Sequence, residues 1–292
     1  MSAHKSGFVS IIGKPNVGKS TLMNALVGDK LSIITPKAQT TRHRIRGIIS
    51  DDDFQIIISD TPGLLKTHYK MHQLMMDHAS EALNDADIIL FVVEPGEHPD
   101  SHEFLRLLLA TQTPVVVVIN KADKSTDSDI EATAAIWKNV FNGGRVIAIS
   151  ALTAFNLGLL IQLIIDLLPE APPYFPKEEI TDRPMRFFAA EIIREKIFLF
   201  YRREIPYSTT VIVDSFKEAE QIDRIHAFIF VERESQKAIL LGHQGKAIKK
   251  VGVEARKEIE SFTGKQAYLE LTVKVSKDWR NNQLQLQRLG FE

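Results

Sequence analysis

The 292-residue sequence contains no cysteine. Disulfide bonds, zinc sites with cysteine ligands and a thiol nucleophile are therefore excluded, and a reducing compartment fits this composition. Long apolar runs are also missing: the longest are IILFVV at 88–93 and VVVVI at 115–119, far shorter than a membrane span. The N-terminal residues show no apolar stretch followed by a small-residue cleavage site, so we expect a cytoplasmic protein.

Net charge is also nearly absent, at −1 for the whole chain, but the two halves differ in sign. Residues 1–182 hold 16 Lys and Arg against 22 Asp and Glu, which gives −6. Residues 183–292 hold 20 against 15, which gives +5. Because a basic region attracts polyanions, the C-terminal half is the candidate for a nucleic-acid partner.

The first 170 residues alternate short apolar runs with stretches of helical pattern. Strands are predicted at 8–13, 54–61, 87–94, 114–120 and 145–150, and the intervals leave room for crossover helices. This order predicts an α/β fold with a mostly parallel sheet and helices on both faces. In open sheets of this kind, ligands bind at the carboxyl ends of the strands.

A proline-rich segment marks the domain boundary. Five prolines fall within residues 168–184, and such a segment can continue neither a helix nor a central strand. We therefore predict a first domain at 1–170, a linker at 171–184 and a smaller α+β domain at 185–292. In the last of these, apolar periodicity predicts the order helix, strand, strand, helix, turn, helix, strand.

A glycine-rich loop follows the first predicted strand. Gly13-x4-Gly18-Lys19-Ser20 matches the P-loop pattern and precedes a predicted helix, as its mechanism requires. Backbone N–H groups of such a loop cradle a phosphate at the positive end of the helix. The lysine reaches the β and γ phosphates, and the serine hydroxyl ligates Mg²⁺.

Three further motifs stand at strand ends. Asp60-Thr61-Pro62-Gly63 offers a carboxylate that can hold Mg²⁺ through water and an N–H that can meet a γ-phosphate. Asn120-Lys121-Ala122-Asp123 offers a carboxylate that can accept two hydrogen bonds from guanine, which adenine cannot supply. Ser150-Ala151 can offer a backbone N–H to the guanine carbonyl. We predict that GTP or GDP is bound by Gly13, Lys14, Pro15, Asn16, Val17, Gly18, Lys19, Ser20, Thr21, Asp60, Thr61, Pro62, Gly63, Leu64, Asn120, Lys121, Ala122, Asp123, Ser150, Ala151 and Leu152.

A second glycine loop, GHQGKAIKK at 242–250, lies in the basic half. Its Gly-x-x-Gly turn joins two predicted helices, and lysines follow at once. This is the arrangement of a KH module, whose loop lets a nucleic-acid backbone pass close while nearby apolar surface receives unstacked bases. The element order matches the second, type II, KH topology, although a glutamine stands in the turn where many KH loops carry lysine or arginine. The predicted RNA-binding residues are Gly242, His243, Gln244, Gly245, Lys246, Lys249 and Lys250.

Residues 8–168 resemble a small GTPase domain of the translation-factor-related class. In that class the segment matching 35–47 is a first switch that places a threonine on Mg²⁺. The resemblance assigns this role to Thr41, with Thr40 as the alternative. It implies metal ligation by Ser20, Thr41 and, through water, Asp60, and catalytic roles for Lys19, Thr41 and Gly63.

Two departures from Ras-like GTPases concern hydrolysis. Where Ras-like enzymes use a glutamine to orient the attacking water, this chain has Leu64, which cannot form a hydrogen bond. The resemblance therefore implies slow intrinsic turnover. Asn16 is the residue type with which relatives hold K⁺, a cation that can stabilise developing phosphate charge. We expect the neighbouring arginines to be solvated or to face RNA, with internal arginine fingers as the alternative: Arg42, Arg44 and Arg46.

Nearly the whole chain resembles the Era family, on the motifs KPNVGKSTL, DTPG, NKAD, IPYS, GHQGKAIKKVGVEAR and the terminal LGF. The family resemblance implies a Mg²⁺-dependent GTP switch that binds the 3′ end of 16S ribosomal RNA. It further implies help in assembling the 30S ribosomal subunit and a coupling of that assembly to cell growth and division. A monomer is expected, in the cytoplasm, with peripheral attachment to the inner membrane as a further expectation.

Two other functions compete with this interpretation. The first is an RNA-modifying GTPase of the tRNA type, which the lack of cysteine and of a long helical middle domain disfavours. The second is a binding module whose nucleotide is structural and never hydrolysed. Hydrolysis measured with and without K⁺ and RNA separates these alternatives.

Overall fold

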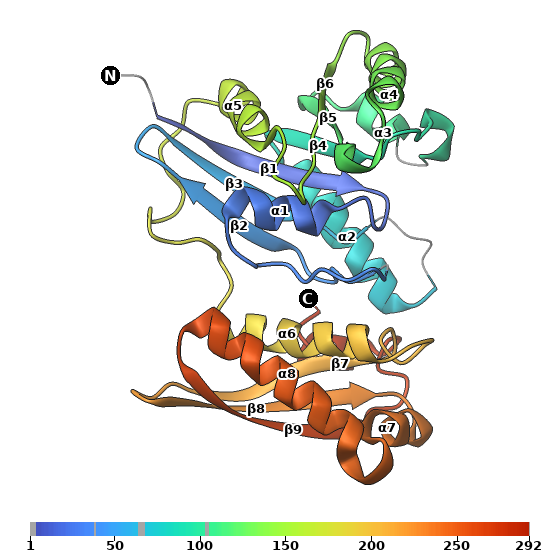
Figure 1. Ribbon diagram of the computed structural model, residues 1–292, viewed down its shortest axis with the longest axis vertical. Helices are drawn as coiled ribbons and strands as arrows, with labels where there is room; N and C mark the ends of the chain where they lie inside the picture. Colours follow the sequence, from blue (N-terminus) through green and yellow to red (C-terminus); the bar gives the residue numbers. More distant parts are fainter. Residues whose placement is uncertain (1–3, 38, 64–67, 103–104, 292) are drawn as a thin grey trace. The chain divides into compact units, whose positions relative to one another are not determined.

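The computed structural model describes residues 4–37, 39–63, 68–102 and 105–291 (Figure 1). The chain forms two compact units, and each contains one of the predicted domains in large part. The first unit comprises Met1–Ser32, Thr41–Leu65 and Met75–Asp182. The second comprises Ile33–Thr40, Lys66–Leu74 and Arg183–Glu292.

A six-stranded sheet forms the centre of the first unit, in the order β2-β3-β1-β4-β5-β6. Neighbouring strands are parallel except β2 and β3, which are antiparallel. The predicted mostly parallel sheet is confirmed, and continuous apolar runs supply its strands because both faces are covered. The strands are β1 (Lys5–Gly13), β2 (Ile45–Ser50), β3 (Phe54–Asp60), β4 (Ile88–Val93), β5 (Val115–Ile119) and β6 (Arg145–Ala148).

Helices connect the strands and cover the sheet, and α1 lies in front of it in Figure 1. One face carries a buried cluster in which Leu108 and Trp137 pack with Phe91 and Val117. The parallel strands bring their carboxyl ends to one edge, where the predicted motifs meet. The helical elements described are α1 (Lys19–Val27), α2 (Lys70–Asn84), η1 (Pro99–Ser101), α3 (Leu105–Ala110), η2 (Ala122–Lys124), α4 (Asp127–Val140) and α5 (Leu157–Leu167).

Residues 171–182, which the proline content marks as linker, lie along the β2–β3 edge of the first unit. The Gln55 side chain accepts hydrogen bonds from the backbone N–H of Tyr174 and of Phe175. The N–H of Ile48 donates to the carbonyl of Ile180 at 2.9 Å. The bond from Ile48 satisfies a backbone group of the edge strand β2 that would otherwise be left to solvent.

The second unit is an α+β domain with a three-stranded sheet in the order β7-β8-β9. Strand β8 is antiparallel to β7 and parallel to β9. This confirms the predicted element order and the type II KH topology, in which a pair of helices connects two parallel strands. The elements are α6 (Met185–Phe200), β7 (Thr210–Lys217), β8 (Ile222–Val231), α7 (Glu234–Leu241), η3 (His243–Gly245), α8 (Lys246–Thr263), β9 (Gln266–Val275) and α9 (Gln283–Arg288).

Helix α8 shows how the pattern of side chains builds this domain. Val251, Ala255 and Ile259 recur at helical spacing and are buried in the domain core. Lys249 and Lys250 lie on the opposite, exposed side. Within the described ranges, none of the helices is both long enough and apolar enough to cross a membrane.

Candidate nucleotide and nucleic-acid sites

The P-loop wraps from the end of β1 into the start of α1. Gly18 caps the N-terminus of α1 with φ at 97°, in the left-handed region that favours glycine. A Cβ atom at Gly18 would lie 2.3 Å from Nδ2 of Asn120, so the site has no room for a side chain there. Nζ of Lys19 donates to the carbonyls of Gly13, at 3.0 Å, and Lys14, at 2.8 Å. The ammonium group is thereby held across the loop, where the phosphate-binding pattern requires it.

The end of β3 brings one carboxylate under the P-loop. Asp60 is completely buried. Its Oδ2 accepts hydrogen bonds from Oγ of Ser20, at 2.7 Å, and from Oγ1 of Thr41, at 3.2 Å. The two hydroxyl oxygens are themselves 3.0 Å apart. The three predicted Mg²⁺ ligands therefore meet in one cluster, although they come from separate parts of the chain.

The charges around this cluster are coupled. Burial raises the pKa of the Asp60 carboxyl, against the opposing effects of neighbouring hydroxyl groups and of the Lys19 ammonium. Burial lowers the pKa of Lys19 to about 8, while the charge of Asp60 works the other way. Oδ1 of Asp60 is buried and no hydrogen bond reaches it. A hard divalent cation with oxygen ligands fits this donor set, because it would pair the carboxylate and both hydroxyls.

Gly63 stands close to the same lysine. A Cβ atom built on Gly63 would lie 3.3 Å from Nζ of Lys19 and 3.3 Å from Pro15. The hydroxyl of Thr61 donates to the carbonyl of Ile11 and ties this turn to β1. The structure thus brings the second motif beside the P-loop. Leu64, the residue in the place of the Ras-like glutamine, lies outside the described residues.

The third and fourth motifs form the opposite wall. Nδ2 of Asn120 donates to the carbonyl of Val17, and Oδ1 of Asn120 accepts from the N–H of Ala151 at 3.0 Å. Oγ of Ser150 donates to Oδ1 of Asp123 at 2.6 Å. Asn120 therefore joins the P-loop to the loop after β6, and the serine orients the carboxylate.

A cavity of about 150 Å³ opens between these loops. Its position, between the P-loop and the Asp123 carboxylate, is where a purine base attached to a P-loop phosphate would lie. Lys124 also lines the cavity. It was not among the predicted residues, because it stands one position beyond the Asn-Lys-Ala-Asp motif. The lining residues are Gly18, Thr21, Asn120, Lys121, Asp123, Lys124, Ala151 and Leu152.

Of the three arginines after Thr41, two are not the solvated or RNA-facing residues expected from the sequence, whereas the side chain of Arg46 is 32% exposed and pairs with Asp182. Arg42 and Arg44 are buried, with 1% and 8% of their surface exposed. Arg44 donates to Oγ of Ser59 and forms a 2.7 Å ion pair with Asp85. The expectation was wrong for Arg42 and Arg44 because charge alone suggested exposure, whereas the fold buries both side chains and pairs Arg44 with the buried Ser59 and with Asp85.

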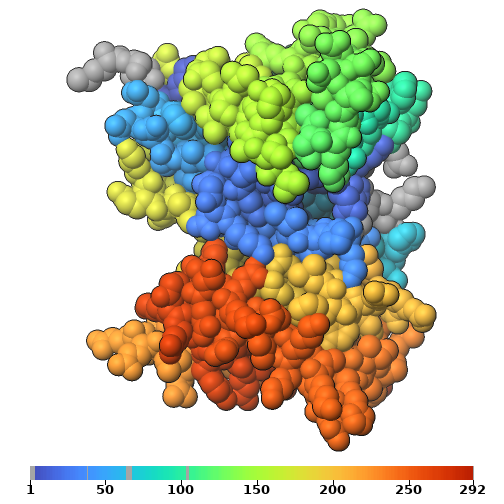
Figure 2. All heavy atoms as spheres, in the orientation of Figure 1, coloured from blue at the N-terminus to red at the C-terminus, as the bar shows by residue number. Residues whose placement is uncertain are grey.

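The glycine loop of the second unit is a tight turn in backbone conformations that favour glycine. Gly242 has φ at 68° and ψ at −178°, a conformation essentially restricted to glycine, and a Cβ atom there would lie 2.6 Å from that of Ala247. Gln244 and Gly245 are also left-handed. Lys246 at the start of α8 is exposed. In Figure 2 the segment joining α7 and α8, in orange, lies at the surface at the lower edge of its unit.

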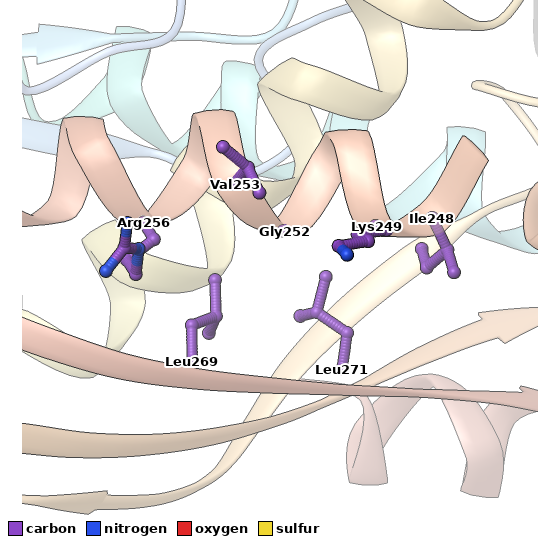
Figure 3. A pocket seen from close by; sticks show the side chains of 7 residues that line it. All are labelled: Ile248, Lys249, Gly252, Val253, Arg256, Leu269 and Leu271. Atoms are coloured by element: carbon purple, nitrogen blue, oxygen red, sulfur yellow. The ribbon is translucent and has the colours of Figure 1, made fainter. Parts of the chain in front are cut away.

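An open cavity of about 280 Å³ lies beside this loop, between α8 and β9 (Figure 3). Its floor is apolar, with Leu269 and Leu271 of β9 below Gly252 and Val253 of α8. The sequence predicted apolar surface near the loop but not which residues form it. Alternation along β9 and the Gly252 position of α8 are the signals that point to them. The cavity is completed by Ile248, Lys249 and Arg256.

These two sites on these two folds define a class of protein, a P-loop GTPase followed by a KH domain. The comparisons with protein families agree with this classification. The model described as a 50S ribosome-binding GTPase matches residues 8–121, and the model described as a KH domain matches residues 204–280.

Comparison with individual proteins is more specific. The chain is 45% identical to GTPase Era of Geotalea daltonii over 98% of both chains, and 42% identical to GTPase Era of a Thermoanaerobacter species, covering 99% and 97%. An Era variant of Aquifex aeolicus solved with GDP and AlF₄⁻ matches with a TM-score of 0.94 at 38% identity, covering 98% and 99%. An Era complex with MgGDPNP and nucleotides 1506–1542 of 16S ribosomal RNA matches with the same TM-score and identity, over 99% of both chains. The chain belongs to the Era family of GTPases.

Two glycines at the ends of α1 provide a matched test of the P-loop geometry. Both have positive φ, but a Cβ atom at Gly18 meets Asn120 whereas one at Gly28 meets nothing within 4 Å. We expect Gly18→Ala to weaken GDP binding by more than about tenfold, since the loop and Asn120 must separate, and Gly28→Ala to change it by less than about twofold. Titration with a fluorescent GDP analogue measures both. Equal losses in the two variants would show that backbone strain, and not the contact with Asn120, governs this position.

Proposed function

We propose that this protein is a GTP-hydrolysing switch that binds the 3′ end of 16S ribosomal RNA and assists assembly of the 30S ribosomal subunit. One observation carries the proposal. The chain contains both a guanine-nucleotide constellation and a Gly-x-x-Gly loop beside an apolar groove. Its relative in complex with MgGDPNP and 16S RNA aligns along 99% of both chains.

The nucleotide site is assigned to the four motifs. Lys19 pairs with the β and γ phosphates, and the N–H of Gly63 donates to the γ phosphate. Ser20 and Thr41 ligate Mg²⁺, and Asp60 holds it through water. The buried cluster of their three oxygens supports this fit and favours Thr41 over Thr40. When bound, the cation neutralises phosphate charge.

Guanine selectivity is assigned to Asp123. Its carboxylate accepts hydrogen bonds from the ring N–H and the amino group of guanine, and Ser150 holds it in place. Ala151 is held by Asn120 at the edge of the same cavity, where its loop meets the guanine carbonyl. Adenine lacks this donor pattern, so an adenine nucleotide would leave the carboxylate unpaired.

Hydrolysis is assigned a slow intrinsic rate. Leu64 supplies no hydrogen bond to an attacking water, so other groups must position it. Asn16 is the assigned K⁺ ligand. It lies in the P-loop with φ at 67°, and its carbonyl accepts a 2.7 Å hydrogen bond from Lys121, which joins the P-loop to the Asn-Lys-Ala-Asp motif.

RNA binding is assigned to the second unit. An RNA backbone lies along Gly242–Gly245 close to the chain, and Lys246, Lys249 and Lys250 neutralise its phosphates. The apolar groove over Leu269 and Leu271 receives unstacked bases.

The domains are assigned as GTPase at 1–170, linker at 171–184 and KH at 185–292. The protein acts as a cytoplasmic monomer that also attaches peripherally to the inner membrane.

The RNA assignment has a matched pair of test positions at the two ends of α8. Gly245 and Gly264 have φ at 72° and 70°, and no atom lies within 4 Å of a Cβ built on either. Gly245→Asp should lower affinity for an RNA with the 16S 3′-terminal sequence by more than about tenfold, because it adds a negative charge beside the phosphates. Gly264→Asp adds the same charge in the same conformation, away from the loop. Filter binding measures RNA affinity, and an unchanged thermal unfolding curve checks that the second unit of each variant is folded. Retained affinity in Gly245→Asp would place the RNA site elsewhere.

The base assignment predicts a switch of nucleotide preference. Asp123→Asn replaces an acceptor by an amide that can donate to the second carbonyl of xanthine. We expect GTP affinity to fall by about tenfold to hundredfold and XTP affinity to rise. Asp127→Asn, on the exposed start of α4, serves as the control. Competition titrations with both nucleotides measure the preference, and unchanged GTP affinity in Asp123→Asn would refute the role of the carboxylate.

The cation assignment predicts faster single-turnover hydrolysis in KCl than in NaCl. Asn16→Gly keeps the positive φ available but removes the amide, so the difference between the two salts should disappear. Equal rates of the unaltered protein in the two salts would rule out the K⁺ role of Asn16.

A further inference from the structure

The sheet of the second unit has two faces with different surroundings. Helices α6, α7 and α8 pack against one of them, and alternate residues of β8 and β9 point into that core. The core residues of these strands are Ile225, Ala227, Ile229, Val231, Ala267, Leu269, Leu271, Val273 and Val275. The residues between them therefore point away from the helices.

The outward face carries rings with cations beside them. Tyr268 is 56% exposed, and the guanidinium carbon of Arg224 lies 5.9 Å from its ring centroid. Nζ of Lys274 lies 3.1 Å from the centroid of Phe228. The ring of Phe228 also contacts His226, with centroids 4.7 Å apart. The ring of Tyr268 is exposed and that of Phe228 is half-buried beneath the Lys274 ammonium, and each ring has a positive charge beside it.

The two pairs are separate positions on neighbouring parallel strands. In the register of β8 and β9, Arg224 lies opposite Tyr268 and Phe228 lies opposite Thr272. Along β8, Arg224 and Phe228 are four residues apart, which corresponds to about 13 Å. Nε2 of His226 lies 3.1 Å from Oγ1 of Thr272, which ties the strands together between them.

Strand β9 links this face to the groove on the other side of the sheet. It is an edge strand, so a ligand can pass around its free edge from one face of the sheet to the other. Leu269 and Leu271 point into the groove beside α8. Tyr268 and Lys274 point to the opposite face. A chain that leaves the groove over the edge of β9 therefore meets these rings next.

We propose that the outward face of the β7-β8-β9 sheet is a second RNA-binding surface, on which Tyr268 and Phe228 stack bases of a single strand that continues from the groove. The inference rests on the proposed RNA-binding function. A KH loop clamps about four nucleotides, whereas the RNA in the related complex spans nucleotides 1506–1542. The additional nucleotides need further surface, and exposed aromatic rings beside cations are the chemistry that binds single strands.

The charges on this face make stacking the larger contribution. Arg224 and Lys274 can each neutralise one phosphate, but Glu270 and Asp214 are also exposed there, and Asp214 lies 3.5 Å from Nδ1 of His226. Lys217 of β7, exposed and opposite Arg224 in register, adds a third cation, but the cations stand among carboxylates, so this face attracts a polyanion weakly. The carboxylates can accept hydrogen bonds from exocyclic amines of stacked bases, as acidic residues do with cytosine.

Two RNA lengths test the proposal on the full-length protein. Oligocytidylate of about four nucleotides fills only the groove, and oligocytidylate of about twelve extends beyond it. We expect Tyr268→Ala to weaken binding of the longer RNA by about fivefold to hundredfold and to leave the shorter RNA unaffected. Tyr268→Phe should bind the longer RNA with the affinity of the unaltered protein, because the aromatic ring remains. Arg224→Gln should reduce the slope of log affinity against log salt concentration for the longer RNA by about one, because one phosphate contact is lost.

Leu284→Ala is the matched control, since Leu284 is 70% exposed in the same unit. No loss in Tyr268→Ala, an equal loss on both RNAs, or a change in sedimentation that reveals a face between two copies would each overturn the proposal. A wild-type protein that binds neither oligocytidylate nor an RNA with the 16S 3′-terminal sequence would instead contradict the proposed function itself. Retained binding of the shorter RNA by Tyr268→Ala confirms that the second unit of the variant is folded.

Discussion

The burial of one carboxylate, that of Asp60, organises the nucleotide site. A buried charge is costly unless it is paired and hydrogen-bonded, and the pairing comes from Lys19 together with the hydroxyls of Ser20 and Thr41. These groups lie on the start of α1, the end of β3 and the approach to β2, so the carboxylate brings three segments to one point. The same arrangement leaves one carboxylate oxygen without a hydrogen bond. The site is therefore organised for a divalent cation and a polyphosphate by the requirements of folding.

The two glycine loops meet different steric requirements. Gly18 is required because Asn120, more than a hundred residues later in the chain, occupies the space of its side chain. The phosphate loop and the base-binding motif are thus packed against each other. Gly242 is required by its own helix pair, since Ala247 occupies the corresponding space. The first loop is part of an enclosed site with buried charges. The second is a local turn beside exposed lysines, which suits a long ligand that passes over the surface.

Much of the site could be predicted because its residues are consecutive. Each nucleotide motif is a short run at the end of an apolar strand, and parallel strands bring such ends together. Residues selected by their charge alone were less predictable. Arg42 and Arg44 looked solvent-facing, yet they are buried, and Arg44 is paired with Asp85, which is distant in sequence. Lys124 and the lining of the KH groove were missed because a single residue beyond a motif, or an alternate position on a strand, has no sequence signature of its own.

The sequence by itself determined the class of fold, the order of the elements, the guanine-nucleotide motifs and the Gly-x-x-Gly turn. All of these depend on local periodicity or on residues that are neighbours in the chain. Tertiary structure alone decided which hydroxyls meet Asp60, which side chain closes against Gly18, and which residues of β9 face the groove or the outward surface. The physical reason is that such contacts depend on strand register and packing between distant segments. A pattern of side chains can show that a face will be buried, but not what will lie against it.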